Sequence, residues 1–285
     1  MLTTDINIRD PFVFPWEDTY YMVGTRAATC WTLADGFDGY ASKDLVHWDG
    51  PVSLFDKPAD FWADKNFWAP EIHFYQGSFY LFATFGSSKT NRKGTSILRA
   101  DAPLGPYRLH SYGQITPQEW NCLDGTFYLS PDGMPYMVFS HEWQDIRDGQ
   151  ICSVPLTKDL TAPAGEIRTL FSASMARPWV RPIAHPRYPG DNFVTDGPFL
   201  YRLPDGALIM LWSTWGDGGY AEAVARSDNG DVTGRWSIDE KPLFAENGGH
   251  GMLFRTFEGR LTLTLHQPNT TLLERPHFFD VTDKL

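Results

Sequence analysis

Five short polar segments of the chain carry side chains that can hold a proton or contact a polar ligand. They are Arg9-Asp10-Pro11-Phe12, Trp68-Ala69-Pro70-Glu71, Leu123-Asp124-Gly125-Thr126, Thr195-Asp196-Gly197-Pro198 and Gly249-His250-Gly251-Met252. Three of the segments supply an aspartate, one supplies an indole and one an imidazole. Aspartate carboxyl groups can give or take a proton in hydrolysis. The five residues Asp10, Trp68, Asp124, Asp196 and His250 are spaced by 58, 56, 72 and 54 positions, so only a repeating fold would bring them together.

The elements that must position these residues are strands. Apolar and aromatic runs of four to eight residues alternate with turns rich in Gly, Pro, Asp and Asn, and no segment keeps a helical period over three turns. Examples of such runs are Tyr20–Val23, Phe79–Thr84, Tyr136–Ser140, Ala207–Ser213 and Arg260–His266. This pattern predicts an all-β fold.

The repeat selects one all-β architecture. Each unit opens with a polar segment and continues with a strand, a hairpin and a second, aromatic-rich strand. Five units of nearly equal length, each long enough for about four short strands, predict a five-bladed β-propeller. We expect four-stranded antiparallel blades around a central channel, in a single domain spanning residues 1–285. The longest interval contains Ser172–Asn192, which we expect to form an extended loop or a blade insertion.

In a propeller the first strand of every blade lines the channel, so the five marker residues should converge on one spot. Three carboxyl groups gathered in a poorly hydrated channel shift one another's pKa values. Such a shift separates an acid from a base. Glycosidic cleavage needs that separation, because one group protonates the leaving oxygen while another activates water.

Read in order, the five segments resemble family 43 of the glycoside hydrolases, from residue 8 to about 282. The resemblance implies a five-bladed propeller that acts on arabinans and xylans. It also implies that Asp10 is the general base and that Asp124 tunes the pKa of the acid and orients it. Asp196 falls where the family carries its general acid, a Glu in a Glu-Gly-Pro or Glu-Ala-Pro sequence.

The shorter side chain at position 196 leaves the identity of the acid open. An aspartate carboxyl lies about one bond length further back than that of a glutamate, and a misplacement of about 1 Å can cost ~100-fold in rate. Either the backbone compensates, with Asp196 as the acid, or Glu142 serves instead. Glu142 follows the second strand of the third blade in the sequence His141-Glu142-Trp143.

Three further residues are candidates for ligand contacts. The resemblance implies that Trp68 forms the apolar floor under the sugar, and we expect His141 and His250 to contact substrate. His250 also resembles the family's central histidine, which implies water or a structural calcium or sodium ion near the axis. One imidazole is a poor calcium site, since calcium prefers about six to eight oxygen ligands.

The resemblance implies an inverting, exo-acting α-L-arabinofuranosidase for oligosaccharides from arabinan or arabinoxylan, with β-D-xylosidase side activity. Two alternatives stay open. One is an endo-arabinanase or xylanase, which needs an open groove, and the other is an inactive propeller that binds carbohydrate. The sequence contains no Gly-rich phosphate-binding loop, so we expect no organic cofactor.

Composition excludes other classes of partner. A net charge of −11 argues against binding nucleic acid, because contacts to the phosphate backbone need clustered Lys and Arg. The sequence contains no run of 18 apolar residues, so we predict no membrane-spanning segment. Three cysteines, an odd number without metal-site spacing, predict no disulfide framework. Residues 1–9 do not read as a signal peptide, so we expect a cytoplasmic protein.

Overall fold

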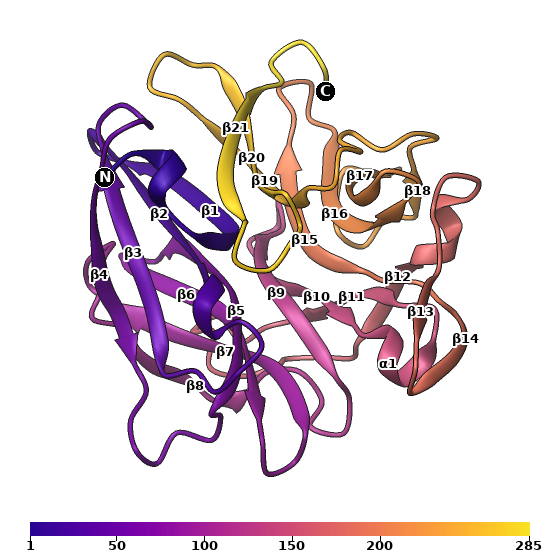
Figure 1. Cartoon of the computed structure of the whole chain (residues 1–285), viewed down its shortest axis with the longest axis horizontal. Helices are drawn as coiled ribbons and strands as arrows, with labels where there is room; N and C mark the ends of the chain where they lie inside the picture. The colour runs from indigo at the N-terminus through magenta and orange to yellow at the C-terminus, as the bar shows by residue number, and fades with distance from the viewer.

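The computed structural model describes all 285 residues as small antiparallel sheets set around a common axis (Figure 1). The first two sheets contain β1 (Ile8–Trp16), β2 (Thr19–Arg26), β3 (Gly36–Ser42) and β4 (Trp48–Asp56), then β5 (Lys65–Tyr75), β6 (Ser78–Ser87), β7 (Arg92–Ala100) and β8 (Arg108–Gln114). The third contains β9 (Cys122–Leu129), β10 (Pro135–His141), β11 (Gln150–Pro155) and β12 (Arg168–Ser172). The fourth contains β15 (Asp196–Arg202), β16 (Leu208–Gly216), β17 (Gly219–Ser227) and β18 (Trp236–Ile238), and the fifth β19 (Gly249–Arg255), β20 (Leu261–Gln267) and β21 (Arg275–Asp280).

The first strands of the five sheets form a closed ring. β1 contacts β5, β9 contacts both β5 and β15, and β19 contacts both β15 and β1. The five predicted segments therefore lie around one axis, and the five-bladed propeller is confirmed. Four blades have the expected four strands, whereas the fifth has three. Its outermost strand, β21, contacts the 3-10 helix η1 (Thr3–Asp5), and Arg275 Nε donates to the carbonyl of Thr4 at 2.9 Å.

Each inner strand is interrupted by a β-bulge with one residue in the left-handed region. These residues are Asp10 (φ 53°), Ala69 (45°), Asp124 (55°), Gly197 (52°) and His250 (55°). A bulge bends a strand and redirects its side chains. In three blades the marker residue itself occupies this position, whereas Trp68 and Asp196 each precede it by one residue. The left-handed backbone position therefore recurs in all five blades, but the marker side chain occupies it in only three of them.

The long third interval carries an insertion, as expected. After β12 come the 3-10 helix η3 (Ala173–Ala176) and a separate hairpin of β13 (Ile183–His185) and β14 (Tyr188–Asn192). Two other short helices lie in loops, η2 (Ala27–Thr29) after β2 and α1 (Trp143–Ile146) after β10. None of the helices has the length and apolarity needed to cross a bilayer.

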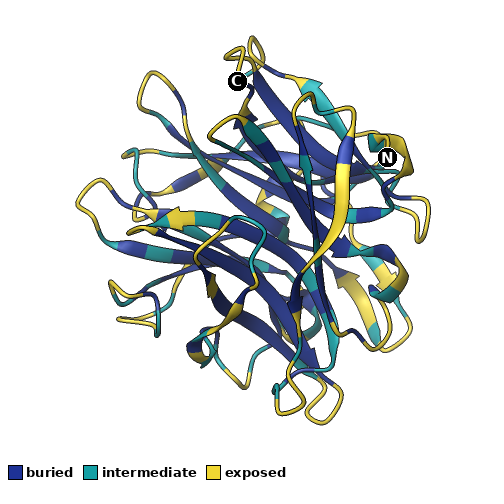
Figure 2. Cartoon of the chain, turned by 90° about the vertical axis from the view of Figure 1, so that its left-hand side faces the viewer, coloured by how far each residue is buried: buried dark blue, intermediate teal, exposed yellow.

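The core lies between the blades, and exposed residues concentrate in the connecting loops (Figure 2). Aromatic side chains that follow the third strands act as plugs, since Trp48, Tyr107 and Trp236 are buried. Most of the aromatic residues are buried in the core or packed against it, which explains their abundance in an all-β chain. The three cysteines are buried and free.

Candidate active site

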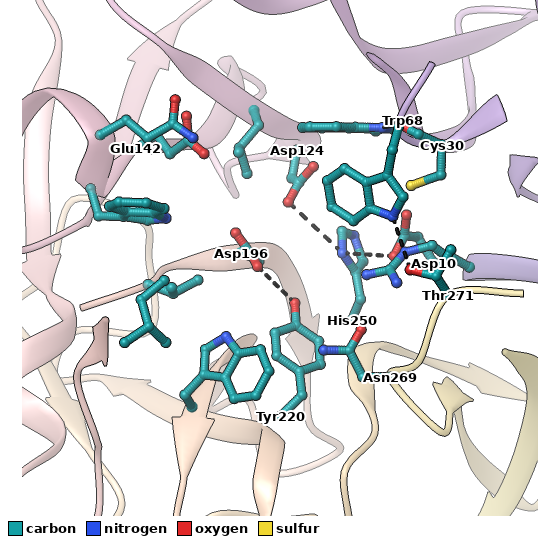
Figure 3. Close-up of a pocket in the computed structure, with 18 of the residues that line it drawn as sticks. Asp10, Cys30, Trp68, Asp124, Glu142, Asp196, Tyr220, His250, Asn269 and Thr271 are labelled. Carbon is teal, nitrogen blue, oxygen red and sulfur yellow. Dashed lines mark hydrogen bonds and ion pairs between the residues drawn. The ribbon is translucent and has the colours of Figure 1, made fainter. Parts of the chain in front are cut away.

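A cavity of about 430 Å³ opens at the axis and is lined by side chains from all five blades (Figure 3). It brings together the five marker residues and one further carboxylate: Asp10, Trp68, Asp124, Glu142, Asp196 and His250. These residues come from inner strands, except Glu142, which precedes α1 at its N-cap position without a capping hydrogen bond. The convergence expected from the repeat is therefore present.

Asp10 lies among cationic and hydrogen-bonding groups. Its Oδ2 accepts a hydrogen bond from Thr25 Oγ1 at 2.6 Å, and its Oδ1 lies 3.3 Å from Nδ1 of His250. The backbone N–H of Asp10 donates to Nδ1 of His266 at 3.2 Å. Burial would raise the pKa of Asp10, but the charges of His250 and Arg9 outweigh it and hold the pKa well below its usual range. Asp10 is therefore ionised across the working range of most enzymes.

His250 lies between two carboxylates, because its Nδ1 is also 3.8 Å from Oδ2 of Asp124. Burial alone would lower its pKa, but the charges of Asp10 and Asp124 raise the pKa of His250 to about 9. The ring is thus an imidazolium at neutral pH. A Cβ on residue 197 would lie 2.8 Å from this ring, so the glycine in the fourth blade leaves the space that His250 fills.

A buried glutamate, Glu222, holds the backbone of His250 through Ser213. The backbone N–H of His250 donates to Ser213 Oγ at 2.6 Å, and that hydroxyl donates to Glu222 Oε2, also at 2.6 Å. Glu222 Oε2 accepts a second bond, from the N–H of Gly251, at 2.9 Å. Burial raises the pKa of Glu222 to about 7. This network fixes the unusual backbone that aims the imidazole at the axis.

Asp124 and Asp196 form a second carboxylate group with a different environment. Oδ2 of Asp124 accepts from the N–H of Gly197 at 3.0 Å, which ties it to the residue that follows Asp196. Oδ2 of Asp196 accepts from the hydroxyl of Tyr220 at 2.9 Å. Burial, and after it the charge of Asp124, raise the pKa of Asp196 well above its ordinary value. Burial also raises the pKa of Asp124, although His250 and the Gly197 N–H oppose that shift.

Glu142 reaches the cavity from the third blade but is paired. Its Oε2 lies 2.5 Å from Nζ of Lys93, a lysine from β7 that is itself buried. The same ammonium lies 5.4 Å from the centre of the Trp68 ring. Burial raises the pKa of Glu142, and Lys93 opposes this shift. Glu142 thus has a cation within contact distance, which Asp196 lacks.

Trp68 lines the cavity, whereas His141 does not. The Trp68 ring lines the cavity, and its Nε1 donates to the carbonyl of Cys30 at 2.6 Å. His141 lies outside the cavity, because neighbouring residues of an extended chain point to opposite sides and Glu142 takes the inward side. The His141 ring instead stacks on Trp120 with centroids 4.0 Å apart, and its Nε2 lies 3.3 Å from Asp145. A direct contact of His141 with substrate does not fit this position.

The residues around His250 also do not fit a calcium site built by the protein. No group of three or more His, Cys, Asp or Glu side chains is placed to hold a metal ion. The imidazole Nδ1 lies 3.3 Å from Asp10 Oδ1 and 3.8 Å from Asp124 Oδ2. The positive charge at the axis is supplied by His250 itself.

Several residues of the site had no sequence signal. Tyr220 and Lys93 lie on the third strands of their blades, outside the repeated openings, and Thr25 lies on β2. His266 contacts Asp10 from β20. Their roles depend on contacts between strands, which spacing along the chain does not report.

Comparison with known proteins gives a consistent result. The family model for glycosyl hydrolases family 43 matches residues 4–281. The crystal structure of an endo-arabinase from Bacteroides thetaiotaomicron superposes with a TM-score of 0.91 and 38% identity, covering 100% of this chain and 97% of that one. An extracellular exo-α-(1→5)-L-arabinofuranosidase of Cellvibrio japonicus is 26% identical over 92% of this chain and 79% of its own length. An extracellular endo-α-(1→5)-L-arabinanase of Bacillus subtilis is 22% identical over 57% of this chain and 50% of its own length.

The two curated relatives correct the predicted location. Both are named as extracellular proteins, so the expectation of a cytoplasmic protein is wrong. That expectation rested on the residue types of positions 1–9, and these do not decide where a folded enzyme acts.

Proposed function

The chain belongs to family 43 of the glycosyl hydrolases and is a glycosidase that acts on arabinose- and xylose-containing polymers, and we propose that its substrate is α-1,5-linked arabinan. The observation that carries the proposal is the pair of opposite pKa shifts within one cavity, on Asp10 and Asp196. One carboxyl is held ionised and the other has a raised pKa, so that it carries its proton to a higher pH than an ordinary aspartate, as hydrolysis of a glycosidic bond requires. The linkage is the one in the names of both curated relatives.

Asp10 acts as the general base in this proposal. Asp10 lines the cavity, and its low pKa keeps the carboxylate ionised and so able to take a proton from water. The imidazolium of His250, 3.3 Å away, stabilises the charge of that carboxylate.

Asp196 acts as the general acid, because burial and, after it, the charge of Asp124 raise its pKa. The Asp124 charge disfavours a second charge on Asp196, while the hydroxyl of Tyr220 fixes the direction of the carboxyl. Glu142 is the weaker candidate, because Lys93 at 2.5 Å stabilises its charged form. We therefore assign Glu142 to binding sugar hydroxyls beside Trp68.

The stereochemical proposal is inversion. Asp10 and Asp196 come from blades 1 and 4 on opposite sides of His250 (Figure 3). Inverting enzymes need about 6.5–9.5 Å between the two carboxyls, so that a water fits between base and sugar. A proton NMR time course should show the inverted anomer of arabinose first, and early appearance of the retained anomer would contradict the assignment of Asp10.

For the mode of attack we propose exo action. The cavity has walls from all five blades and from β13, whose Ile183 and His185 line it, which favours a pocket over a groove. A pocket of this kind also accommodates β-D-xylosides, as side activity. Endo action is the second candidate, because the structure with 38% identity is named an endo-arabinase.

Linear α-1,5-arabinan separates the two modes. Exo action releases arabinose from the start and lowers the viscosity slowly. Endo action lowers the viscosity at once and gives a ladder of oligosaccharides. Parallel assays with 4-nitrophenyl α-L-arabinofuranoside and β-D-xyloside measure the sugar preference, and failure to cleave either arabinan or the arabinoside would overturn the proposed substrate.

A further inference from the structure

Trp31 is an unusually exposed indole at the wall of the cavity. It lies in the loop after η2, lines the cavity, and exposes 58% of its surface. Exposing so much of a large aromatic ring forgoes hydrophobic stabilisation, because that stabilisation scales with the apolar area removed from water. Its position beside the candidate active site suggests a ligand contact.

The Trp31 ring is fixed although it is exposed. Its Nε1 donates to Thr271 Oγ1 at 3.2 Å, which links two loops 240 residues apart. The guanidinium carbon of Arg9 lies 5.5 Å from the ring centre, and the Trp68 ring meets it at 5.3 Å with an interplanar angle of 69°. A ring held by three neighbours loses little conformational freedom when a ligand arrives.

We propose that Trp31 is the platform of a second sugar-binding subsite, which takes the arabinofuranosyl unit next to the one that lies on Trp68. This inference rests on the proposed function. The C–H face of a furanose is apolar, so packing on an indole removes apolar area from water on both partners. The cavity volume falls within the range of about 300–1,000 Å³ typical of ligand pockets and leaves room for more than one pentose ring.

The neighbours of Trp31 favour carbohydrate as the occupant. Arg9, Asn269 and Thr271 line the cavity beside it and offer polar groups for hydroxyls. The exposed Leu272 and Leu273 follow Thr271 but do not line the cavity. An apolar protein partner would use those leucines, whereas a sugar in the cavity meets the indole and the polar groups.

The test compares ligands of different length on one inactive background. In Asp10→Asn protein, calorimetry gives the Kd of L-arabinose and of α-1,5-arabinotriose with and without Trp31→Ala. We expect Trp31→Ala to raise the Kd of the triose about tenfold, and that of arabinose less than about threefold, because only the triose reaches the platform. Trp31→Phe should restore most of the triose affinity, since a flat apolar face remains.

Tyr112, on the surface and away from the cavity, provides the control variant. Tyr112→Ala removes a side chain that is 84% exposed on β8, outside the cavity, and should change neither Kd. Equal losses for both ligands, or a change of association state in place of a change in Kd, would overturn the platform. If wild-type protein cleaves no arabino-oligosaccharide, both the proposed function and the platform fail. If it cleaves them while Trp31→Ala keeps the triose advantage, the platform alone fails.

Discussion

The two sides of the active-site cavity contain the same residue type under opposite control. On the side of blades 1 and 5, Asp10 is flanked by His250 and Arg9, and its pKa is lowered. On the side of blade 4, Asp196 faces another carboxyl and a phenol, and its pKa is raised. Burial acts in the same direction on both, so it does not distinguish them. Placement of the cationic side chains determines which aspartate is the base and which is the acid.

Removing the charge on the cation-rich side should have the largest effect. Asp10→Asn keeps the shape of the side chain but cannot accept the proton of water, so we expect kcat to fall by about 10,000-fold. Initial rates on arabino-oligosaccharides, with circular dichroism for the fold, measure this. Asp18→Asn changes an exposed aspartate in the turn between β1 and β2 and should be neutral. An Asp10→Asn variant with more than a tenth of the wild-type kcat would disprove the base assignment.

On the other side, loss of the acid should depend on the leaving group. A sugar alcohol leaves poorly without a proton, whereas dinitrophenolate needs little help. We expect Asp196→Ala to lose about 1,000-fold on oligosaccharides and to keep most activity on a dinitrophenyl arabinoside. Addition of the missing methylene by Asp196→Glu then reports whether the shorter side chain limits the rate.

Glu142→Ala is the matched variant for that measurement. It removes a carboxyl of the same cavity that is paired with Lys93, so we expect similar losses on both substrates. The reverse pattern, with leaving-group dependence in Glu142→Ala and none in Asp196→Ala, would make Glu142 the acid and Asp196 a positioning residue.

The sequence predicted the repeat well because each blade is a local unit. Polar openings before aromatic strands reported five inner strands, and their spacing reported a ring, so Asp10, Asp124 and His250 could be placed at the axis without coordinates. The offset of Trp68 and Asp196 by one residue from the left-handed position was not predicted, since a bulge depends on how two strands pair.

Side chains from later strands of a blade escaped prediction for a related reason. Lys93 pairs with Glu142 and Tyr220 hydrogen-bonds Asp196, yet Lys93 and Tyr220 both lie outside the repeated polar openings. His141 was misplaced because the direction of its side chain depends on where β10 ends. The calcium or sodium ion near the axis stays a prediction, and no group of three or more His, Cys, Asp or Glu side chains is placed to hold it.

Removing the charge of His250 should shift the alkaline limb of the pH profile. His250→Asn suits the left-handed backbone, which asparagine tolerates. Loss of the imidazolium raises the pKa values of both Asp10 and Asp196, because its charge lowers each of them. Asp10 stays ionised across the working range in both proteins, so we expect only the alkaline limb of kcat/KM, which reports Asp196, to move up by about one pH unit. His47→Gln, on the surface, should leave the profile unchanged, and an alkaline limb that stays in place or moves down in His250→Asn would contradict this role of His250.

The smallest expected effect is on stability and concerns the cation-poor side alone. In the unfolded chain Asp196 ionises at its ordinary pKa of about 4, whereas in the folded protein its pKa is raised. The folded state therefore binds the extra proton, and this contribution to stability is present at low pH and is lost as pH rises through the folded pKa. Asp196→Asn keeps an acceptor for Tyr220 and removes the charge that forms beside Asp124.

Thermal unfolding at two pH values tests this account of Asp196. Asp196→Asn should match the wild-type Tm near pH 4 and exceed it by about 2 °C at pH 8. Glu142→Gln is the matched contrast, because it leaves the buried ammonium of Lys93 without its counter-charge, at a cost of about 3 kcal/mol. Its Tm should therefore lie below that of the wild type at pH 8, where the Asp196 variant gains. If Asp196→Asn lowers the Tm equally at both pH values, the carboxyl is not held protonated by its neighbours, and the difference between the two sides of the cavity would have to come from the bound sugar.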